Sequence, residues 1–218
     1  MATFLDRRDA GRKLAARLAQ YRDASPIVVA LPRGGVPVGD EIARALDAEL
    51  DILVARKLGA PGNPEFAIGA VAPGVTWVED ASVKALGVSN DFLARSVARE
   101  QDELRRREQT FRGDRPPLEV GQRMVILVDD GLATGATAIA AIESLRRQAP
   151  AGIVLAVPVG APDTVGALRS RVDDLVCLDT PLFFRAVGQA YVDFTPTTDE
   201  EVHEILRGRH VEAGEGSL

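Results

Sequence analysis

Two adjacent carboxylates followed by a loop rich in glycine and threonine form the part of the chain best suited to chemistry. Asp129 and Asp130 come directly after four apolar residues, and residues 131–137 read Gly-Leu-Ala-Thr-Gly-Ala-Thr. Glycine lets a backbone turn its N–H groups toward an anion, and threonine hydroxyls donate further hydrogen bonds. The loop is therefore predicted to bind a phosphate. Because carboxylates repel phosphate, we expect the two acids to face sugar hydroxyls or a divalent cation.

The residues on either side of this loop predict the elements that hold it. Residues 125–128 are all apolar, which is typical of a strand buried on both faces of a sheet. Residues 138–147 carry apolar side chains at helical spacing, and the positive N-terminal end of such a helix would face the loop. This order places the loop at the carboxyl edge of a sheet, where α/β folds bind ligands. The alternative is a helix cap and a turn without a ligand.

The stretch from Val125 to Thr137 resembles the phosphoribosyl pyrophosphate (PRPP) motif of type I phosphoribosyltransferases, which has four apolar residues, two acids and a loop ending in Thr-Gly-x-Thr. The resemblance implies that Asp129 and Asp130 hold the ribose 2- and 3-hydroxyls and Mg2+. It also makes Asp130 a candidate to assist a proton at the acceptor. The residues that it assigns to the 5-phosphate are Ala133, Thr134, Gly135, Ala136 and Thr137. Gly131 replaces the branched apolar residue that is common in the family, which we expect to loosen the loop.

A second glycine-rich loop, Pro32-Arg33-Gly34-Gly35, lies between an apolar run at 27–31 and a helix predicted over 38–46. A guanidinium can bind two phosphoryl oxygens at once, and glycine amides can add further donors. In the family, the loop after the first core strand binds pyrophosphate. The resemblance therefore assigns this role to Arg33, Gly34 and Gly35, with Arg33 among the catalytic residues. Taken alone, Arg-Gly-Gly is more typical of a simple turn.

A third candidate site follows the next predicted strand, residues 51–55. Residues 57–65 contain too much glycine and proline to suggest regular structure. Family members carry a mobile loop near this point that closes over the diphosphate and brings a cation. Lys57 is the candidate for that catalytic cation, and Arg56 is the second choice. A solvated charge at the end of a strand is the alternative interpretation.

Residues 58–120 form a long insertion between two core strands, which is far beyond a normal connection. The insertion is predicted to contain a hairpin, with strands at 67–71 and 75–78, and a helix from Ser89 to about residue 111. It would serve as an active-site lid or as a dimer surface. Strands at 153–159 and 174–178 follow it, separated by a helix at 162–171. The alternation of strands and helices predicts an α/β fold, a Rossmann-like parallel sheet with helices on both faces.

The segment 179–210 corresponds to the small C-terminal hood that covers the acceptor in type I phosphoribosyltransferases. It contains several aromatic residues, and Phe184 loosely matches the aromatic that stacks on the base in purine-salvage members. Packing of Phe184 in a core is an equally good alternative. Residues 1–210 are thus predicted to form one domain, with a helix at 199–206. Residues 211–218 are predicted to be a disordered tail.

Composition narrows the class of protein. The formal net charge is −6, which argues against a general nucleic-acid binder. The single cysteine, Cys177, excludes an internal disulfide, and the chain has no apolar run long enough for a membrane span. We therefore expect a soluble, cytoplasmic protein without membrane or nucleic-acid partners. The family resemblance implies PRPP and a small-molecule acceptor as partners, and a homodimer.

The function that the resemblance implies is transfer of the 5-phosphoribosyl group from PRPP to an acceptor, commonly a nucleobase, with release of pyrophosphate and with Mg2+ as cofactor. The alternative is a PRPP-sensing regulator that binds without turnover. Retention of Arg33-Gly34-Gly35 favours an enzyme, because an enzyme must handle the departing pyrophosphate. A nicotinamide-binding domain is disfavoured, because no Gly-x-Gly-x-x-Gly follows a predicted strand.

Overall fold

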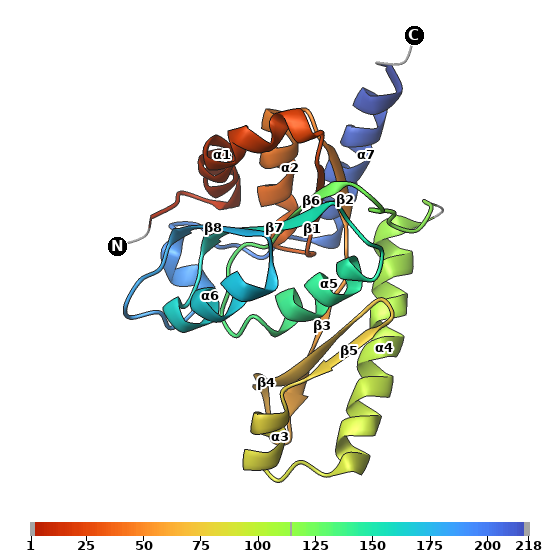
Figure 1. Cartoon of the computed structure of the whole chain (residues 1–218), viewed down its shortest axis with the longest axis vertical. Helices are drawn as coiled ribbons and strands as arrows, with labels where there is room; N and C mark the ends of the chain where they lie inside the picture. Colours follow the sequence, from red (N-terminus) through yellow and green to blue (C-terminus); the bar gives the residue numbers. More distant parts are fainter. Residues whose placement is uncertain (1–2, 114, 216–218) are drawn as a thin grey trace.

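The computed structural model describes residues 3–113 and 115–215, with the backbone alone for residues 209–215. At its centre is a five-stranded sheet in which all neighbouring strands run parallel (Figure 1). In order across the sheet, the strands are β2 (Glu49–Ile52), β1 (Ile27–Ala30), β6 (Met124–Val128), β7 (Gly152–Val159) and β8 (Asp174–Asp179). Every residue of β1 and β7 is buried, as expected for strands covered on both faces. The predicted parallel α/β fold is confirmed.

Helices cover both faces of this sheet (Figure 1). One face packs against α1 (Arg7–Leu18) and α2 (Gly35–Leu46), and the other against α5 (Ala136–Arg146) and α6 (Pro162–Leu168). Alternate residues of each strand enter different cores, because successive side chains point to opposite faces. Val28 of β1, for example, lies in the core that contains α1 and α2, whereas Val29 lies in the core that contains α5.

A second, antiparallel sheet and two helices make up what we call the arm, residues 56–112. Its elements are β3 (Arg56–Ala60), β4 (Asn63–Ala72), β5 (Val75–Val78), α3 (Asp80–Ala85) and α4 (Asn90–Arg112). The strand order is β3-β4-β5, and the long helix α4 lies beside this sheet and reaches the central sheet at its C-terminal end, where Arg112 pairs with Asp51 (Figure 1). The predicted hairpin and long helix are present. Ser89 caps α4 by accepting a hydrogen bond from the amide of Phe92.

The prediction of irregular structure for residues 57–65 was wrong. Most of these residues belong to β3 and β4, which pair with a shift in register around Gly59. A Cβ at Gly59 would lie 2.6 Å from the Cα of Pro64, so this glycine allows two strands to approach closely. The central strand expected at 51–55 is instead Glu49–Ile52, and Arg56 already begins the arm.

The C-terminal part crosses back over the carboxyl edge of the central sheet. It contains the short helix η3 (Val187–Ala190) and the helix α7 (Asp199–Glu215). Short 3-10 turns also follow α1 and α6, as η1 (Ala19–Ala24) and η2 (Arg169–Arg171). Residues 211–215, part of the predicted disordered tail, belong to α7, and residues 216–218 lie outside the described residues. In the described part of the chain, no helix has the length and apolarity needed to cross a membrane.

Candidate functional site

The two predicted acids lie at the carboxyl end of the central strand β6. Val128, the last residue of β6, is buried, and Asp129 and Asp130 follow it into a turn. The amide of Asp130 donates a hydrogen bond of 2.8 Å to Oδ1 of Asp129, which fixes one oxygen of that carboxylate. Burial raises the pKa of Asp129 well above its usual range, and the neighbouring charge of Asp130 adds to the effect. The pair could accept hydrogen bonds from hydroxyls, and a bound cation would balance its charge.

An arginine from the N-terminal helix holds the second acid. Arg7 Nε donates to Oδ2 of Asp130 at 2.8 Å, and the two side chains are only 11% and 16% exposed. Burial raises the pKa of Asp130, and the charge and hydrogen bond of Arg7 oppose that shift. The hydroxyl of Tyr191 donates to the main-chain carbonyl of Asp130 at 2.6 Å. Asp130 is therefore held from the side chain and from the backbone.

The glycine-rich loop after β1 lies directly against these acids. A Cβ on Gly34 would fall 1.9 Å from Oδ2 of Asp130, and one on Gly35 would fall 2.7 Å from the carbonyl oxygen of Val128. The amide of Leu31 donates to the same Val128 carbonyl at 2.8 Å. The peptide bond between Pro32 and Arg33 is cis. The structure thus brings together two loops that are separated by almost 100 residues in the sequence.

The third part of the site is the loop that leads into α5. Gly135 adopts a left-handed conformation with φ of 73° at the start of this helix, and no side chain caps it. Thr164 of α6 donates to the carbonyl of Ala133 at 2.7 Å and supports the loop from behind. Ala133 and Thr134 are exposed, whereas Thr137 is half-buried. An uncapped helix N-terminus behind an accessible loop is a suitable place for a phosphate.

Comparison with known proteins decides the family of this chain. The model of the phosphoribosyl transferase domain matches residues 4–195, which include all three loops described above. The chain belongs to the phosphoribosyltransferase family.

Two matches over nearly all of this chain and one local match accompany this assignment. The crystal structure of TT1426 from Thermus thermophilus is 45% identical, has a TM-score of 0.79, and covers 94% of this chain and 98% of that one. A Mycobacterium tuberculosis relative, provisionally named a phosphoribosyl transferase, is 44% identical over 96% of this chain but only 48% of its own length. A uracil phosphoribosyltransferase from Levilactobacillus brevis is 42% identical over 35% of this chain and 36% of its own. The chain therefore spans about half the length of the mycobacterial relative.

The two cations predicted for the site are partly exposed, and each is paired with an acid. Arg33 Nη1 is 3.3 Å from Oδ1 of Asp199, and both side chains are more than 40% exposed. Lys57 lies in β3, where its ammonium is 3.1 Å from Oε2 of Glu65 and also donates to the Glu65 carbonyl. Among the described residues, neither cation forms an ion pair with Asp129 or Asp130. Ion pairs that are exposed in this way contribute little free energy.

The aromatic residue predicted for the acceptor lies in the hood. Phe184 is partly buried and packs against a small cluster that includes Phe4 and Tyr191. Its neighbours Leu182 and Phe183 are each 88% exposed. The structure therefore gives Phe184 the packing contacts that the alternative interpretation expected.

Sequence reasoning missed several residues of the site. Arg7 and Tyr191 contact Asp130, Phe194 packs beneath Arg7, and Thr164 supports the loop at Ala133. A signal for Arg7 was present in the sequence, because a cation at the start of a helix opposes the helix dipole and requires another reason to be there. No comparable sequence signal marks Tyr191, Phe194 or Thr164.

The donor set of the acid pair fits magnesium. Carboxylate oxygens are preferred ligands of Mg2+, which commonly uses one or two carboxylates together with substrate oxygens and water. Within the described residues, no group of three or more potential ligands from His, Cys, Asp and Glu is found. Asp129 and Asp130 would therefore bind the ion jointly with a substrate, as an incomplete protein site.

Proposed function

We propose that this phosphoribosyltransferase moves the 5-phosphoribosyl group from PRPP to a nucleobase acceptor and releases pyrophosphate. The observation that carries the proposal is the contact of Gly34 with the carboxylate of Asp130. This contact places the loop suited to a diphosphate beside the acids suited to a ribose. The phosphate-binding loop follows the same acids in the chain. Diphosphate, ribose and 5-phosphate, the three parts of PRPP, thus each have a matching group of residues.

The hydrogen bonds of the acid pair indicate which oxygens receive the ribose. Within the protein, Oδ1 of Asp129 and Oδ2 of Asp130 already accept hydrogen bonds. We assign the other oxygen of each carboxylate to the 2- and 3-hydroxyls. The 5-phosphate would accept hydrogen bonds from the amides and hydroxyls of residues 133–137, where the N-terminal end of α5 adds a favourable field. The sugar is thereby held at both ends, which orients C1 for attack.

Negative charge grows on the pyrophosphate as its bond to C1 breaks, so the protein must stabilise that charge. The amide of Gly34 would serve the diphosphate, whereas the amide of Gly35 already donates to the carbonyl of Leu31 at 3.0 Å, so Gly35 would contribute by its close approach to the sheet edge. Arg33 would exchange Asp199 for phosphoryl oxygens when PRPP binds. Lys57 would make the corresponding exchange from the arm, leaving Glu65. Mg2+, held by Asp129 and Asp130 together with the substrate, would neutralise further charge on the diphosphate.

The acceptor would bind beneath the hood, beside the acid pair. The hood brings Tyr191 and Phe194 to Asp130 and Arg7, and Phe184 lies in the same aromatic cluster. A planar base suits such surroundings because aromatic rings stack favourably. We propose Phe184 as a residue that shapes this subsite, and Asp130 as the group that assists a proton at the acceptor.

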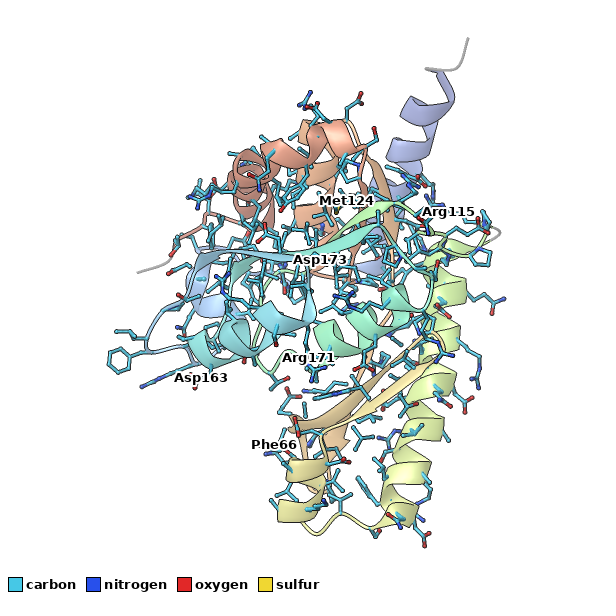
Figure 2. All side chains as sticks on the ribbon, viewed as in Figure 1. Phe66, Arg115, Met124, Asp163, Arg171 and Asp173 are labelled. Carbon is cyan, nitrogen blue, oxygen red and sulfur yellow. The ribbon has the colours of Figure 1, made fainter. Side chains whose placement is uncertain are left out.

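The proposal extends to assembly and location. We propose a homodimer in the cytoplasm, with the arm as a contact between subunits. Phe66, which Figure 2 shows on the arm, is 46% exposed, and Leu86 on the same arm is 51% exposed. Contiguous apolar surface marks interaction sites, and we propose that these two side chains belong to such a surface. Sedimentation equilibrium tests the assembly, with a monomer as the contradicting result.

The first experiment is isothermal titration with PRPP and Mg2+ of the unaltered protein and of the double variant Asp129→Asn/Asp130→Asn. We expect binding by the former and its loss in the latter, because amides neither balance a cation nor accept hydroxyl hydrogen bonds as strongly. Asp102→Asn is the control, since Asp102 lies on α4 with a side chain that is 73% exposed. Absence of binding by the unaltered protein would refute the proposed substrate.

A second measurement separates an enzyme from a PRPP sensor. The protein is incubated with PRPP, Mg2+ and single nucleobases, and pyrophosphate release is followed. Release with one base supports transfer and names the acceptor. Binding of PRPP without release for any purine or pyrimidine would favour the non-catalytic alternative.

A further inference from the structure

The position of Arg7 is unfavourable for the helix in which it lies. Arg7 is the first residue of α1, after the cap Asp6, and a cation there opposes the helix dipole. Its side chain is nevertheless 11% exposed, whereas the next residue, Arg8, is 41% exposed. Burying a guanidinium costs free energy unless partners compensate it. The contacts of Arg7 must therefore explain its placement.

Those contacts join three segments that are distant in the sequence. Arg7 Nε binds Oδ2 of Asp130 at 2.8 Å, and Nη1 donates to the carbonyl of Thr195 at 2.8 Å. The guanidinium carbon lies 3.9 Å from the centre of the Phe194 ring, a favourable cation–π distance. A Cβ on Gly34 would be 3.1 Å from Arg7 Nε. The acid pair, the hood and the diphosphate loop thus meet at one guanidinium.

We propose that Arg7 is a positioning residue that fixes the Asp130 carboxylate in the orientation needed to bind the ribose of PRPP. The inference rests on the proposed function. Arg7 and Gly34 enclose Oδ2, which leaves Oδ1 as the oxygen that faces the ligand. Thr195 and Phe194 anchor the guanidinium on its other side, so the carboxylate cannot turn without disturbing the hood. Arg7 itself acts through Asp130 and does not touch the substrate.

Arginine suits this task better than lysine. Its planar fork holds two hydrogen bonds in fixed directions and stacks on an aromatic ring, whereas an ammonium is a compact charge on a flexible stem. The charge alone would attract Asp130 but would not define the direction of its oxygens. Arg7→Lys should therefore restore part of the effect that Arg7→Gln removes.

The test uses titration of the full chain with PRPP in the presence of Mg2+. We expect Arg7→Gln to weaken binding about ten-fold, equivalent to about 1.4 kcal/mol, and Arg7→Lys to lie between it and the unaltered protein. Arg8→Gln is the matched control, because Arg8 is the adjacent residue but pairs with Asp40 and Glu41. Its affinity should be unchanged. Circular dichroism and thermal melting of each variant show whether it is folded.

A double-mutant cycle tests the route through Asp130. If Arg7 acts by positioning this carboxylate, Arg7→Gln should have no further effect on PRPP affinity once Asp130→Asn is present. A purely structural role would instead lower affinity by the same factor in both backgrounds. A loss of stability alone cannot produce this result, because the comparison uses the PRPP affinity of variants that are folded.

The possible outcomes separate the inference from the function on which it rests. If Arg7→Gln and Arg7→Lys both bind PRPP with the affinity of the unaltered protein, the role of Arg7 is overturned and the proposed function stands. Additive losses in the cycle also overturn the role of Arg7. Absence of PRPP binding by the unaltered protein overturns the proposed function and the inference with it. If Arg7→Gln does not fold, Arg7→Lys and its cycle with Asp130→Asn provide the same decision.

Discussion

At the scale of single residues, glycine determines which segments can approach the acid pair, because it has no side chain. Gly34 has φ of −60° and ψ of −31°, a helical conformation that alanine adopts without strain. Only space prevents a larger residue, because its Cβ would overlap the carboxylate of Asp130. Gly34 is therefore required by a close approach between two loops, and substitution there tests the site without altering the backbone preference.

We predict that Gly34→Ala loses most PRPP affinity while the chain stays folded. The added methyl group must displace Asp130 or Arg7, which moves the ribose-binding oxygens. Gly166→Ala is the matched control, since nothing lies within 4 Å of a Cβ there and alanine raises helix stability by up to about 1 kcal/mol. Titration with PRPP and Mg2+ measures the effect. Unchanged affinity in Gly34→Ala would show that the two loops are not parts of one site.

Gly131 departs from the family pattern for a reason visible in the fold. A Cβ there would lie 2.5 Å from Cγ1 of Val187, which occupies the space above the loop. We therefore replace the expected loosening of the loop with a packing requirement. Gly131→Ala should lower the free energy of unfolding by about 1 to 3 kcal/mol through overpacking. Val187→Ala in the same chain should restore much of the loss. Urea denaturation measures both, and two additive losses would contradict the contact.

The single cysteine provides a prediction about pH. Burial raises the pKa of Cys177 to about 11, and its thiol donates to the carbonyl of Asp179 at 3.2 Å. The folded protein should therefore react with iodoacetamide at pH 8 about 100-fold more slowly than a free thiol. Since the unfolded state loses this proton near its ordinary pKa of about 8.5, the folded state loses stability as pH rises above that value. Fast labelling of the native protein would contradict the burial of the thiol.

The sequence was most informative where the candidate site residues are contiguous. Asp129, Asp130 and the loop after them were predicted because they are contiguous and their residue types imply charge and hydrogen bonding. Arg7 and Tyr191 reach Asp130 from positions more than 60 residues away in the sequence, and no local pattern links them to it. Long-range packing therefore determines the part of the site that sequence reasoning missed.

At the scale of elements, the arm shows where local patterns mislead. Glycine and proline at 57–65 were interpreted as irregular structure, but the two strands use Gly59 to approach one another. Tertiary pairing overrides local preference in such cases. The long helix α4 was predicted correctly because its cap and its charged face are local features. The packing of the arm against the core depends on contacts between residues that are far apart in the sequence, and no local pattern predicts them.

One such connection is the ion pair between α4 and the central sheet. Arg112 binds both carboxylate oxygens of Asp51 at 2.9 Å, and the side chains are 12% and 13% exposed. We predict that Asp51→Ala lowers the free energy of unfolding by about 3 kcal/mol, because it leaves a nearly buried guanidinium without its partner. Asp102→Ala on the same helix is the control and should change it by less than about 0.5 kcal/mol. Chemical denaturation measures both, and equal small effects would contradict the role of this pair.

At the scale of the whole molecule, the site is built from both ends of the chain and its middle. Arg7, Gly34, Asp130 and Thr195 come from four separate segments and meet at one edge of the sheet. The parallel sheet itself was predictable, because alternating apolar strands and amphipathic helices leave few other arrangements. The contact between the hood and the N-terminal helix was not predictable, because it depends on the single side chain of Arg7.

This construction predicts that substrate stabilises the entire fold. PRPP with Mg2+ at about 100 times its dissociation constant should add about 2.7 kcal/mol to the free energy of unfolding. Calorimetry should show a single transition that moves to higher temperature, because the proposed site combines segments that are far apart in the chain. Asp129→Asn/Asp130→Asn should remove the shift. A ligand-dependent shift of one partial transition would indicate that the segments do not unfold together.

The arm begins at Arg56 and ends at Arg112. Arg112 forms an ion pair with Asp51, which lies a few residues before the start of the arm. Its two ends therefore meet at one place on the core. Between these ends the arm also packs along the core, because Ala70, Ala72 and Val75 share a hydrophobic core with α5, and the hydroxyl of Ser144 in α5 donates to the carbonyl of Pro73 at 2.8 Å. A change in the length of the arm would therefore have to preserve both its closure at Asp51 and the packing of its hairpin against α5.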